Sequence, residues 1–324
     1  MKHTKRILLS LSFLIFHLSF GIAASPDTLV VAQDGSGQYK TIAGALWQIG
    51  PYRQQKQVIY VKKGVYKEKL LVRDIVYNLE ICGEDRDQTI ITFDDNSKKK
   101  DPVTGRQLGT FGSYTLKIDG QRIILRNLTV ENTTRRHTQG VALHTSGDRL
   151  QFINCRFLGF VDTIFTGNIG SRVLFSNCYI EGGLDFIFGP ATAWFEQCTI
   201  HSVSDEFVTA ASTFPESRYG YVFNRCRLTA ADGVKRVLLG RPWRSEYAYT
   251  LFMHCHIGKH IGKAGWQDWS ERAKTGCVRY YEYENEGPGA AAEGRVPWSR
   301  QLTGQEAAEV TPANVFGDTS WIEY

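Results

Sequence analysis

A short motif recurs along the middle of the chain with the same order of apolar and polar positions. Each copy has the form Phe-x-x-Cys-x-apolar, and the five copies begin at Phe152, Phe175, Phe195, Phe223 and Phe252. An earlier segment, 125–130, fits the same frame with leucine in place of phenylalanine and cysteine. A repeat of 20–30 residues built on short strand patterns is typical of a solenoid.

The alternation of apolar and polar residues within each copy predicts β-strands rather than helices. Successive coils of a β-solenoid stack at about 4.8 Å, so residues one period apart lie side by side. The sequence therefore predicts a single all-β domain over residues 25–324, with the repeat most regular between Tyr114 and Ile257. We expect the tail from Lys259 to form loops and short helices folded back along the coil.

The N-terminal part of this domain predicts a cap. A first strand is expected at 29–32, and Thr41 is placed to cap a short helix through Ala45, Leu46 and Ile49 that Gly50 and Pro51 end. This helix would close the open end of the coil, because terminal turns of repeat proteins need capping. Further strands are expected at 58–61, 79–82 and 90–93.

The first 24 residues predict a secretory signal peptide. Lys2, Lys5 and Arg6 precede an almost wholly apolar run, 7–22, and small residues follow at 23–25. The alternative, a membrane anchor, is disfavoured because the run is short, and no later segment is apolar enough to cross a bilayer. Removing the segment takes the net charge from +5 to +2, which gives no reason to expect a nucleic-acid partner. We expect a secreted protein, a monomer with no membrane partner.

The cysteines follow the repeat. Five of the seven occupy the same slot of the motif, at 155, 178, 198, 226 and 255. Cysteine is small and apolar enough to be buried, so an interior cysteine ladder is expected, in which one adjacent pair could form a disulfide. No cysteine or histidine cluster has metal-site spacing. His254, His256 and His260 invite a metal site, but His254 and His256 flank Cys255 and should both point outward, so a metal site is disfavoured.

Three polar residues stand at equal intervals within the repeat: Gln139, Asp162 and Asp185, each 23 positions after the last. In a β-solenoid this spacing predicts a column of one amide and two carboxylates on one face. Two carboxylates about 5 Å apart among apolar residues do not ionise equally, so one can serve as a general acid and the other as a nucleophile or base. Arg241 is the candidate that holds one aspartate ionised.

Gln139 could donate to a developing oxyanion. No serine nucleophile motif is present. The competing interpretation is a polar ladder that serves the structure alone. A set of two aspartates, a glutamine and an arginine bordered by aromatic residues favours a catalytic site instead.

Four motifs carry a resemblance to the pectin methylesterases, carbohydrate esterase family 8. They are Gln-Gly-Val-Ala-Leu at 139–143, Asp-Thr at 162–163, Asp-Phe-Ile-Phe-Gly at 185–189 and Leu-Gly-Arg-Pro-Trp at 239–243. The segments 34–42, 64–68 and 265–266 are similar to further motifs of the family. The likeness covers nearly the whole mature chain, and the segments after Tyr219 and around 295–298 look more like the bacterial branch than the plant one.

The resemblance implies a single-stranded right-handed parallel β-helix, of the pectin-lyase-like kind, that hydrolyses galacturonic acid methyl esters of pectin without a cofactor or metal. By position, Asp185 would be the nucleophile, Asp162 the acid and base, Gln139 an oxyanion donor and Arg241 the partner that orients Asp185. Substrate would be bound by four aromatic side chains, Phe165, Phe188, Trp243 and Trp266. Some relatives form a disulfide at the positions of Cys178 and Cys198.

One position departs from the family pattern. A second glutamine usually precedes the acid–base aspartate and donates to the oxyanion, but here the residue is Val161. Loss of one such donor typically costs about 100- to 1000-fold in rate. Either another group substitutes, or the enzyme is slow, or the substrate has changed. A smaller departure is Gly140, where alanine is usual.

Two other functions compete with an esterase. A polysaccharide-binding β-helix that has lost catalysis is motivated by Val161, although a binder gains little from paired carboxylates. A lyase would want acidic calcium ligands and a basic proton abstractor, and a glycosidase would want carboxylates on both sides of a glycosidic oxygen. Neither arrangement is evident in the sequence.

Overall fold

The computed structural model describes residues 28–323. They form a right-handed parallel β-helix in which every paired strand runs parallel to its neighbours, as the sequence predicts. The predicted signal peptide, residues 1–24, lies outside the described residues. Among the described residues, no helix is both long and apolar enough to span a membrane.

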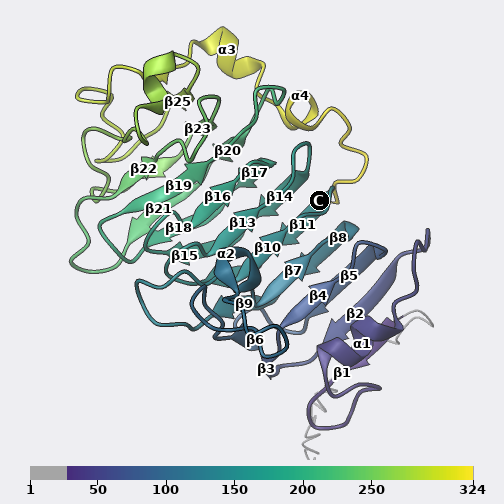
Figure 1. The fold of residues 1–324 in the computed structure, drawn as a ribbon. Coiled ribbons are helices and arrows are strands. Elements are labelled where there is room, and N and C mark those ends of the chain that lie inside the picture. Colours follow the sequence, from purple (N-terminus) through teal and green to yellow (C-terminus); the bar gives the residue numbers. More distant parts are fainter. Residues whose placement is uncertain (1–27, 324) are drawn as a thin grey trace, which may run out of the picture.

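Each coil contributes strands to three sheets (Figure 1). The eleven-stranded long sheet contains β1 (Thr28–Val31), β2 (Gln57–Val61), β5 (Tyr77–Gly83), β8 (Gln121–Arg126), β11 (Leu150–Ile153), β14 (Arg172–Ser176), β17 (Thr192–Glu196), β20 (Tyr221–Asn224), β23 (Tyr249–Met253), β25 (Arg279–Tyr283) and β26 (Arg300–Gln301). The eight-stranded sheet contains β3 (Gly64–Lys67), β6 (Thr89–Phe93), β9 (Thr129–Asn132), β12 (Arg156–Leu158), β15 (Tyr179–Gly182), β18 (Thr199–Ser202), β21 (Arg227–Ala230) and β24 (His256–Ile257). The seven-stranded sheet contains β4 (Leu70–Val72), β7 (Leu116–Ile118), β10 (Leu143–Thr145), β13 (Ile164–Thr166), β16 (Ile187–Gly189), β19 (Phe207–Ala211) and β22 (Leu238–Gly240).

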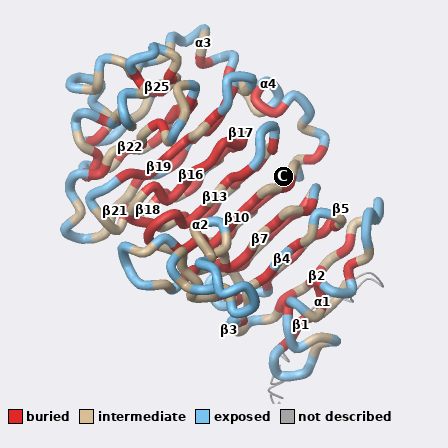
Figure 2. Tube along the Cα trace, viewed as in Figure 1, coloured by how far each residue is buried: buried red, intermediate tan, exposed pale blue. Residues whose placement is uncertain are grey.

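The motif phenylalanines form a continuous stack inside the coil. They lie in register on neighbouring strands of the long sheet, with ring centroids 4.3–4.7 Å apart. The predicted cysteine ladder lies beside them and is buried, with Leu128 in the same slot of the preceding coil. Figure 2 shows that the buried residues follow the strands and the exposed ones the connecting loops.

Two corners of each coil concern the function. The first corner joins the long sheet to the eight-stranded sheet and is tight: a single residue with positive φ, such as Asn127, Asn154 or Asn177, makes the turn. The second corner joins the eight-stranded sheet to the seven-stranded sheet and is longer. Asp162 lies at the second corner between β12 and β13, and Asp185 lies there between β15 and β16.

The N-terminal end of the coil is closed as predicted. Helix α1 (Ile42–Gln48) begins after Thr41, whose side chain accepts from the Gly44 amide, and it buries Ile42, Ala45 and Leu46. The Glu68 carboxylate also accepts from the first two amides of this helix. Since those amides have no partner within a helix, this carboxylate adds a second cap.

The C-terminal tail corrects one expectation. It does contain short helices, η1 (Arg272–Thr275), α3 (Gly304–Ala308) and α4 (Pro312–Phe316), and its end returns along the outer face of the long sheet, where Gln151 hydrogen-bonds to the backbone of Trp321 and Glu323. However, β25 and β26 continue the long sheet, which we did not expect, because the tail lacks the Phe-x-x-Cys motif. The remaining helix, α2 (Gly109–Gly112), lies in the loop before β7.

Candidate active site

Asp162 and Asp185 occupy equivalent places in successive coils. The residues before them, Val161 and Leu184, form a parallel bridge, and the following strands pair Ile164 with Ile187. Both aspartates have left-handed backbones, with φ of 65° and 46°, a conformation that costs energy for a non-glycine residue and often marks a functional site. They are 6% and 8% exposed. The 23-residue spacing therefore predicted their juxtaposition correctly.

The Gln139 side chain contacts this pair, although its backbone is out of register with Asp162. Its backbone pairs with Val161 and not with Asp162, so it stands one residue out of line, because the loop before β10 is longer than the later ones. The side chain compensates, and its Nε2 donates to Asp162 Oδ2 at 2.8 Å. The predicted amide–carboxylate contact is present, although equal spacing alone gives the wrong register for the glutamine.

Arg241 lies directly after β22 and binds Asp185 through two parallel hydrogen bonds. Nε donates to Oδ1 at 3.0 Å and Nη2 to Oδ2 at 2.6 Å. Its guanidinium is held between the rings of Phe207 and Trp269, whose centroids lie 4.1 and 4.2 Å away. The sequence reasoning missed both rings. The available signal was the Gly-Trp-Gln-Asp-Trp run, in which Trp269 follows Trp266 by three residues.

The two carboxyl groups have different electrostatic surroundings. Burial and the neighbouring Asp185 carboxylate raise the pKa of Asp162 to about 7, although Gln139 and Arg241 oppose this. Burial also raises the pKa of Asp185, but there the hydrogen bonds and charge of Arg241 act directly against it. These surroundings favour Asp162 as the holder of a proton shared by the pair, and Asp185 as the carboxylate.

Three of the four predicted aromatic residues border the site. Phe165 and Phe188 are neighbours on β13 and β16 with ring centroids 5.0 Å apart, and Trp243 packs edge-on against Phe188 at 5.5 Å. Phe188 is nearly covered, at 3% exposed, while Phe165 and Trp243 remain partly exposed.

The prediction that Trp266 lines the cleft is wrong. Its backbone bridges to Gly240, and its side chain is 1% exposed inside the coil, between Phe252 and Tyr280. Trp269 is the tryptophan of this segment that contacts a candidate catalytic residue.

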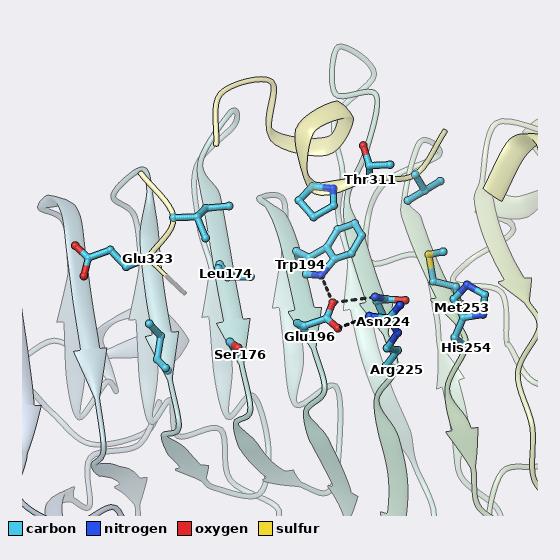
Figure 3. Close-up of a pocket in the computed structure, with 14 residues that line it drawn as sticks. Leu174, Ser176, Trp194, Glu196, Asn224, Arg225, Met253, His254, Thr311 and Glu323 are labelled. Carbon is cyan, nitrogen blue, oxygen red and sulfur yellow. Dashed lines mark hydrogen bonds and ion pairs between the residues drawn. The ribbon is translucent and has the colours of Figure 1, made fainter. Parts of the chain in front are cut away.

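Two pockets flank the solenoid. One, of about 480 Å³, lies beside the candidate catalytic residues and includes Phe165 and Trp243 in its walls. The other, of about 490 Å³, lies between the outer face of the long sheet and the C-terminal tail, where Trp194 donates to Glu196 (Figure 3). The second pocket contains none of the residues proposed for chemistry.

The cysteine ladder is reduced in this structure. Cys178 and Cys198 are free thiols, and each donates to backbone carbonyls of its own and the previous coil, so the bridge that the resemblance implied is not formed. Burial raises the pKa of the Cys155 and Cys226 thiols well above the usual range, as expected for inert interior cysteines.

Two of the three histidines near the C-terminal end of the coil contact acidic side chains. His254 faces Glu284 and His256 faces Glu286, at 3.5 and 3.4 Å, while His260 is buried. Within residues 28–323 no group of three or more histidine, cysteine or acidic side chains is arranged to hold a metal ion.

Comparison with known proteins identifies the family. The Pectinesterase family model matches residues 28–320. Pectinesterase 31 of Arabidopsis thaliana is 35% identical over 86% of this chain and 88% of its own length. The chain spans only about half the length of several other plant relatives, whose names join a pectinesterase to a pectinesterase inhibitor.

Solved structures agree. The pectin methylesterase from carrot has a TM-score of 0.82 and 32% identity, covering 91% of this chain and 94% of that one. A pectin methylesterase in complex with a hexasaccharide has a TM-score of 0.79 and 29% identity, covering 93% of this chain and 100% of that one. The chain therefore belongs to the pectinesterase family and is a carboxylic ester hydrolase.

Proposed function

We propose that this protein hydrolyses methyl esters of the homogalacturonan of pectin, releasing methanol, through an acyl-enzyme formed on Asp185. The observation that carries the proposal is the pairing of two buried carboxyl groups of which only one has an arginine partner. The names of the relatives support pectin as the substrate, and one similar structure holds a hexasaccharide.

In the first half of the reaction, the Asp185 carboxylate attacks the ester carbonyl carbon of a galacturonate unit. Arg241 keeps Asp185 ionised and fixes its orientation before the attack. As the tetrahedral intermediate collapses, protonated Asp162 donates its proton to the departing methanol. The product is a mixed anhydride between Asp185 and the substrate acid.

In the second half, the now ionised Asp162 accepts a proton from water, and the water oxygen attacks the substrate carbonyl of the anhydride. The carboxylate of Asp185 is released together with the free galacturonic acid, which then loses its proton to solvent, and Asp162 is protonated again. A pKa near 7 suits this alternation, because both protonation states of Asp162 are then accessible at neutral pH.

The oxyanion of both steps would be stabilised by Gln139. One hydrogen of its Nε2 is donated to Asp162, which leaves the other for the substrate oxygen. Val161 lies directly beside Gln139 in the ladder, at the position where a second amide would act, and offers no side-chain donor. The missing second donor supports a second candidate function, a pectin-binding β-helix with impaired catalysis or an esterase for an altered substrate.

The experiment that separates these functions measures methanol release from highly methylated pectin by the mature chain. Wild type, Asp185→Ala and Val161→Gln are compared, with folding checked by circular dichroism. We expect release by the wild type, none by Asp185→Ala, and an increase of about 10- to 100-fold for Val161→Gln if the added amide reaches the oxyanion.

Other outcomes would change the assignment. Activity gained only in Val161→Gln would indicate an esterase that has decayed or that serves another ester. No turnover by either protein, with retained binding to pectin, would favour the binding module. We also propose that the protein is secreted, since pectin lies outside the cell, and that it is a monomer. The location of the mature chain tests secretion, and its mass in solution tests the monomeric state.

A further inference from the structure

The side chain assigned to the oxyanion, Gln139, depends on its backbone for its position. Gln139 is exposed, and among the described residues its side chain has one hydrogen-bond partner, Asp162. Its backbone is held from two sides, since it pairs with Val161 and its carbonyl accepts from the Ser97 amide at 3.0 Å. A group that fixes this backbone therefore also places the side-chain amide.

One buried side chain, Asn132, connects the segment of Gln139 to a neighbouring loop. Asn132 ends β9 and is 6% exposed. Its Nδ2 donates to three backbone carbonyl oxygens, at 3.0 Å to Asp95, 2.9 Å to Ser113 and 3.2 Å to Val141. A side-chain amide has two hydrogens, so its whole donor capacity is used and one hydrogen is shared.

Two of these three carbonyl groups belong to the loop that carries α2. Asp95 and Ser113 lie near the two ends of this loop, between β6 and β7. The Ser97 amide of the same loop donates to the Gln139 carbonyl. The third carbonyl group lies two residues after Gln139. Asn132 therefore restrains Gln139 both along the chain and through the loop that contacts it.

Gly140 leaves the space in which this asparagine packs. A Cβ atom at position 140 would lie 2.5 Å from Thr134 Cγ2 and 2.8 Å from Asn132 Oδ1. Non-bonded carbon atoms prefer a separation of about 3.5–4.0 Å, so a methyl group there would have to displace one of the two side chains. Asn132 Oδ1 is itself held by the Thr134 amide, which donates to it at 3.0 Å. Glycine, where the family usually has alanine, therefore allows Asn132 to pack directly against the Gln139 segment.

We propose that Asn132 is a positioning residue for ester hydrolysis, which holds the Gln139 backbone so that the side-chain amide reaches the oxyanion, and that Gly140 is needed for this contact. The hydrogen bonds of Asn132 involve neither aspartate of the site, so it acts through Gln139 and is not itself catalytic. Because Val161 offers no second side-chain donor, that residue does not compensate for a displacement of Gln139. The inference rests on the proposed esterase reaction and assigns a further residue to it.

The test compares Asn132→Ala with a matched control, Asn224→Ala. Asn224 also ends a strand, β20, is 7% exposed, and donates its side-chain amide to Glu196 on the outer face of the long sheet (Figure 3). For each variant we measure kcat and KM on methylated pectin, the unfolding free energy in urea, and the pKa of Asp162 by carbon-13 NMR of its carboxyl carbon. Both changes are also made in the Gln139→Ala background, which completes a double-mutant cycle.

We expect Asn132→Ala to lower kcat by about 10- to 100-fold with KM nearly unchanged, because a misplacement of about 1 Å at a catalytic group can cost this much. In the Gln139→Ala background the same change should lower kcat little further. The hydrogen bond from Gln139 lowers the pKa of Asp162, so this pKa should rise in Asn132→Ala. Asn224→Ala should lose stability and change neither kcat nor this pKa.

Gly140→Ala tests the same contact and carries the test if Asn132→Ala does not fold. We expect kcat to fall by about 10-fold. Adding Thr134→Ser should restore part of the loss, since it removes the methyl group that the new Cβ atom would meet.

The inference is overturned if both single variants keep the wild-type kcat, or if Asn132→Ala lowers kcat equally with and without Gln139. A loss of stability with no change in kcat or in the pKa of Asp162 would give Asn132 a structural role only. If the wild type releases no methanol, the proposed function fails, and the pKa of Asp162 then decides the positioning role. A rise confined to Asn132→Ala supports it, and an unchanged pKa overturns it.

Discussion

At both corners of the coil, polar residues from successive coils stack with left-handed backbones and form a ladder. The residues are asparagines at the first corner and aspartates at the second, and they differ in their chemistry. At the first corner, Asn127, Asn154 and Asn177 have φ of 51–54°, and each later asparagine donates its amide to the oxygen of the one before, at 2.8 and 3.2 Å. At the second corner, Asp162 and Asp185 have φ of 65° and 46°, but neither carboxylate can donate while ionised.

The difference shows what turns a structural ladder into a site. The amides bond to one another, with one further hydrogen bond from Arg86 to Asn154, and need no counter-ion or proton. The asparagine ladder therefore remains partly exposed and inert. Buried carboxylates need a donor, a counter-ion or a proton, which Gln139, Arg241 and the raised pKa of Asp162 supply. The reactivity therefore comes from groups around the ladder and not from its backbone.

The largest effect is expected when a carboxylate of the second corner is replaced by the amide found at the first corner. Asp185→Asn keeps the size of the side chain and removes the nucleophile. We expect methanol release to fall by about 10⁴-fold or more, with the circular dichroism spectrum unchanged. Activity within about 10-fold of wild type after removal of this carboxylate would mean that Asp185 is not the nucleophile.

A second test uses the dependence of stability on pH. The pKa of Asp162 is raised from 3.8 to about 7 on folding, so the folded state holds this proton more tightly than the unfolded state does. The associated stability is complete below about pH 4 and is lost as the pH rises through 7, up to about 4 kcal/mol for a fully buried group.

Asp162→Asn should therefore flatten the stability curve between about pH 4 and 7. Urea denaturation across this range measures the unfolding free energy at each pH. The exposed Asn177→Asp variant should leave the slope in place, and a slope retained in Asp162→Asn would assign the proton to another group.

A third test weakens the support of Arg241. Trp269→Ala removes one of the two rings that hold the guanidinium. A cation–π contact of this kind contributes about 0.5–2 kcal/mol, so we expect kcat to fall by about 3- to 30-fold with KM nearly unchanged, and the acid limb of the pH profile to move upward as Asp185 becomes easier to protonate.

The matched control is Trp47→Ala, which removes a 74% exposed ring lying 5.4 Å from Arg73, away from the site. It should change neither kcat nor the pH profile. A uniform loss of stability without a shift of the acid limb would give Trp269 a structural role only.

The smallest effect is expected at the first corner. Asn177→Asp replaces the amide that donates to Asn154 with an exposed carboxylate. We expect a loss of about 0.5–1 kcal/mol in unfolding free energy and an unchanged rate of methanol release. A large loss of activity would show that the two ladders are coupled, contrary to the comparison.

The sequence was most informative where the repeat is regular. The Phe-x-x-Cys motif predicted the stacked phenylalanines, the buried cysteines and the pairing of Asp162 with Asp185, because a fixed period in a solenoid becomes a fixed neighbour. It failed where loop length varies. Gln139 stands one residue out of register, and β25 extends the long sheet without the motif.

The direction of side chains was the second feature that the sequence did not predict. Trp266 and Trp269 lie three residues apart in one irregular segment, and periodicity does not say which of them faces inward. The bridge between Trp266 and Gly240 decides this, and it turns Trp266 into the core and leaves Trp269 over Arg241. Phe207 was missed for the same reason, since its role depends on a contact with a residue 34 positions later.

The most direct test of the central claim is to titrate the two carboxyl groups themselves. Carbon-13 NMR of protein labelled at the aspartate carboxyl carbon, compared with Asp162→Asn and Asp185→Asn, assigns each signal. We predict that Asp162 titrates with a pKa near 7 and that Asp185 is already ionised there. If both groups lose their protons together at acid pH, or if Asp185 holds the proton at neutral pH, the division of roles between the two carboxyl groups is wrong.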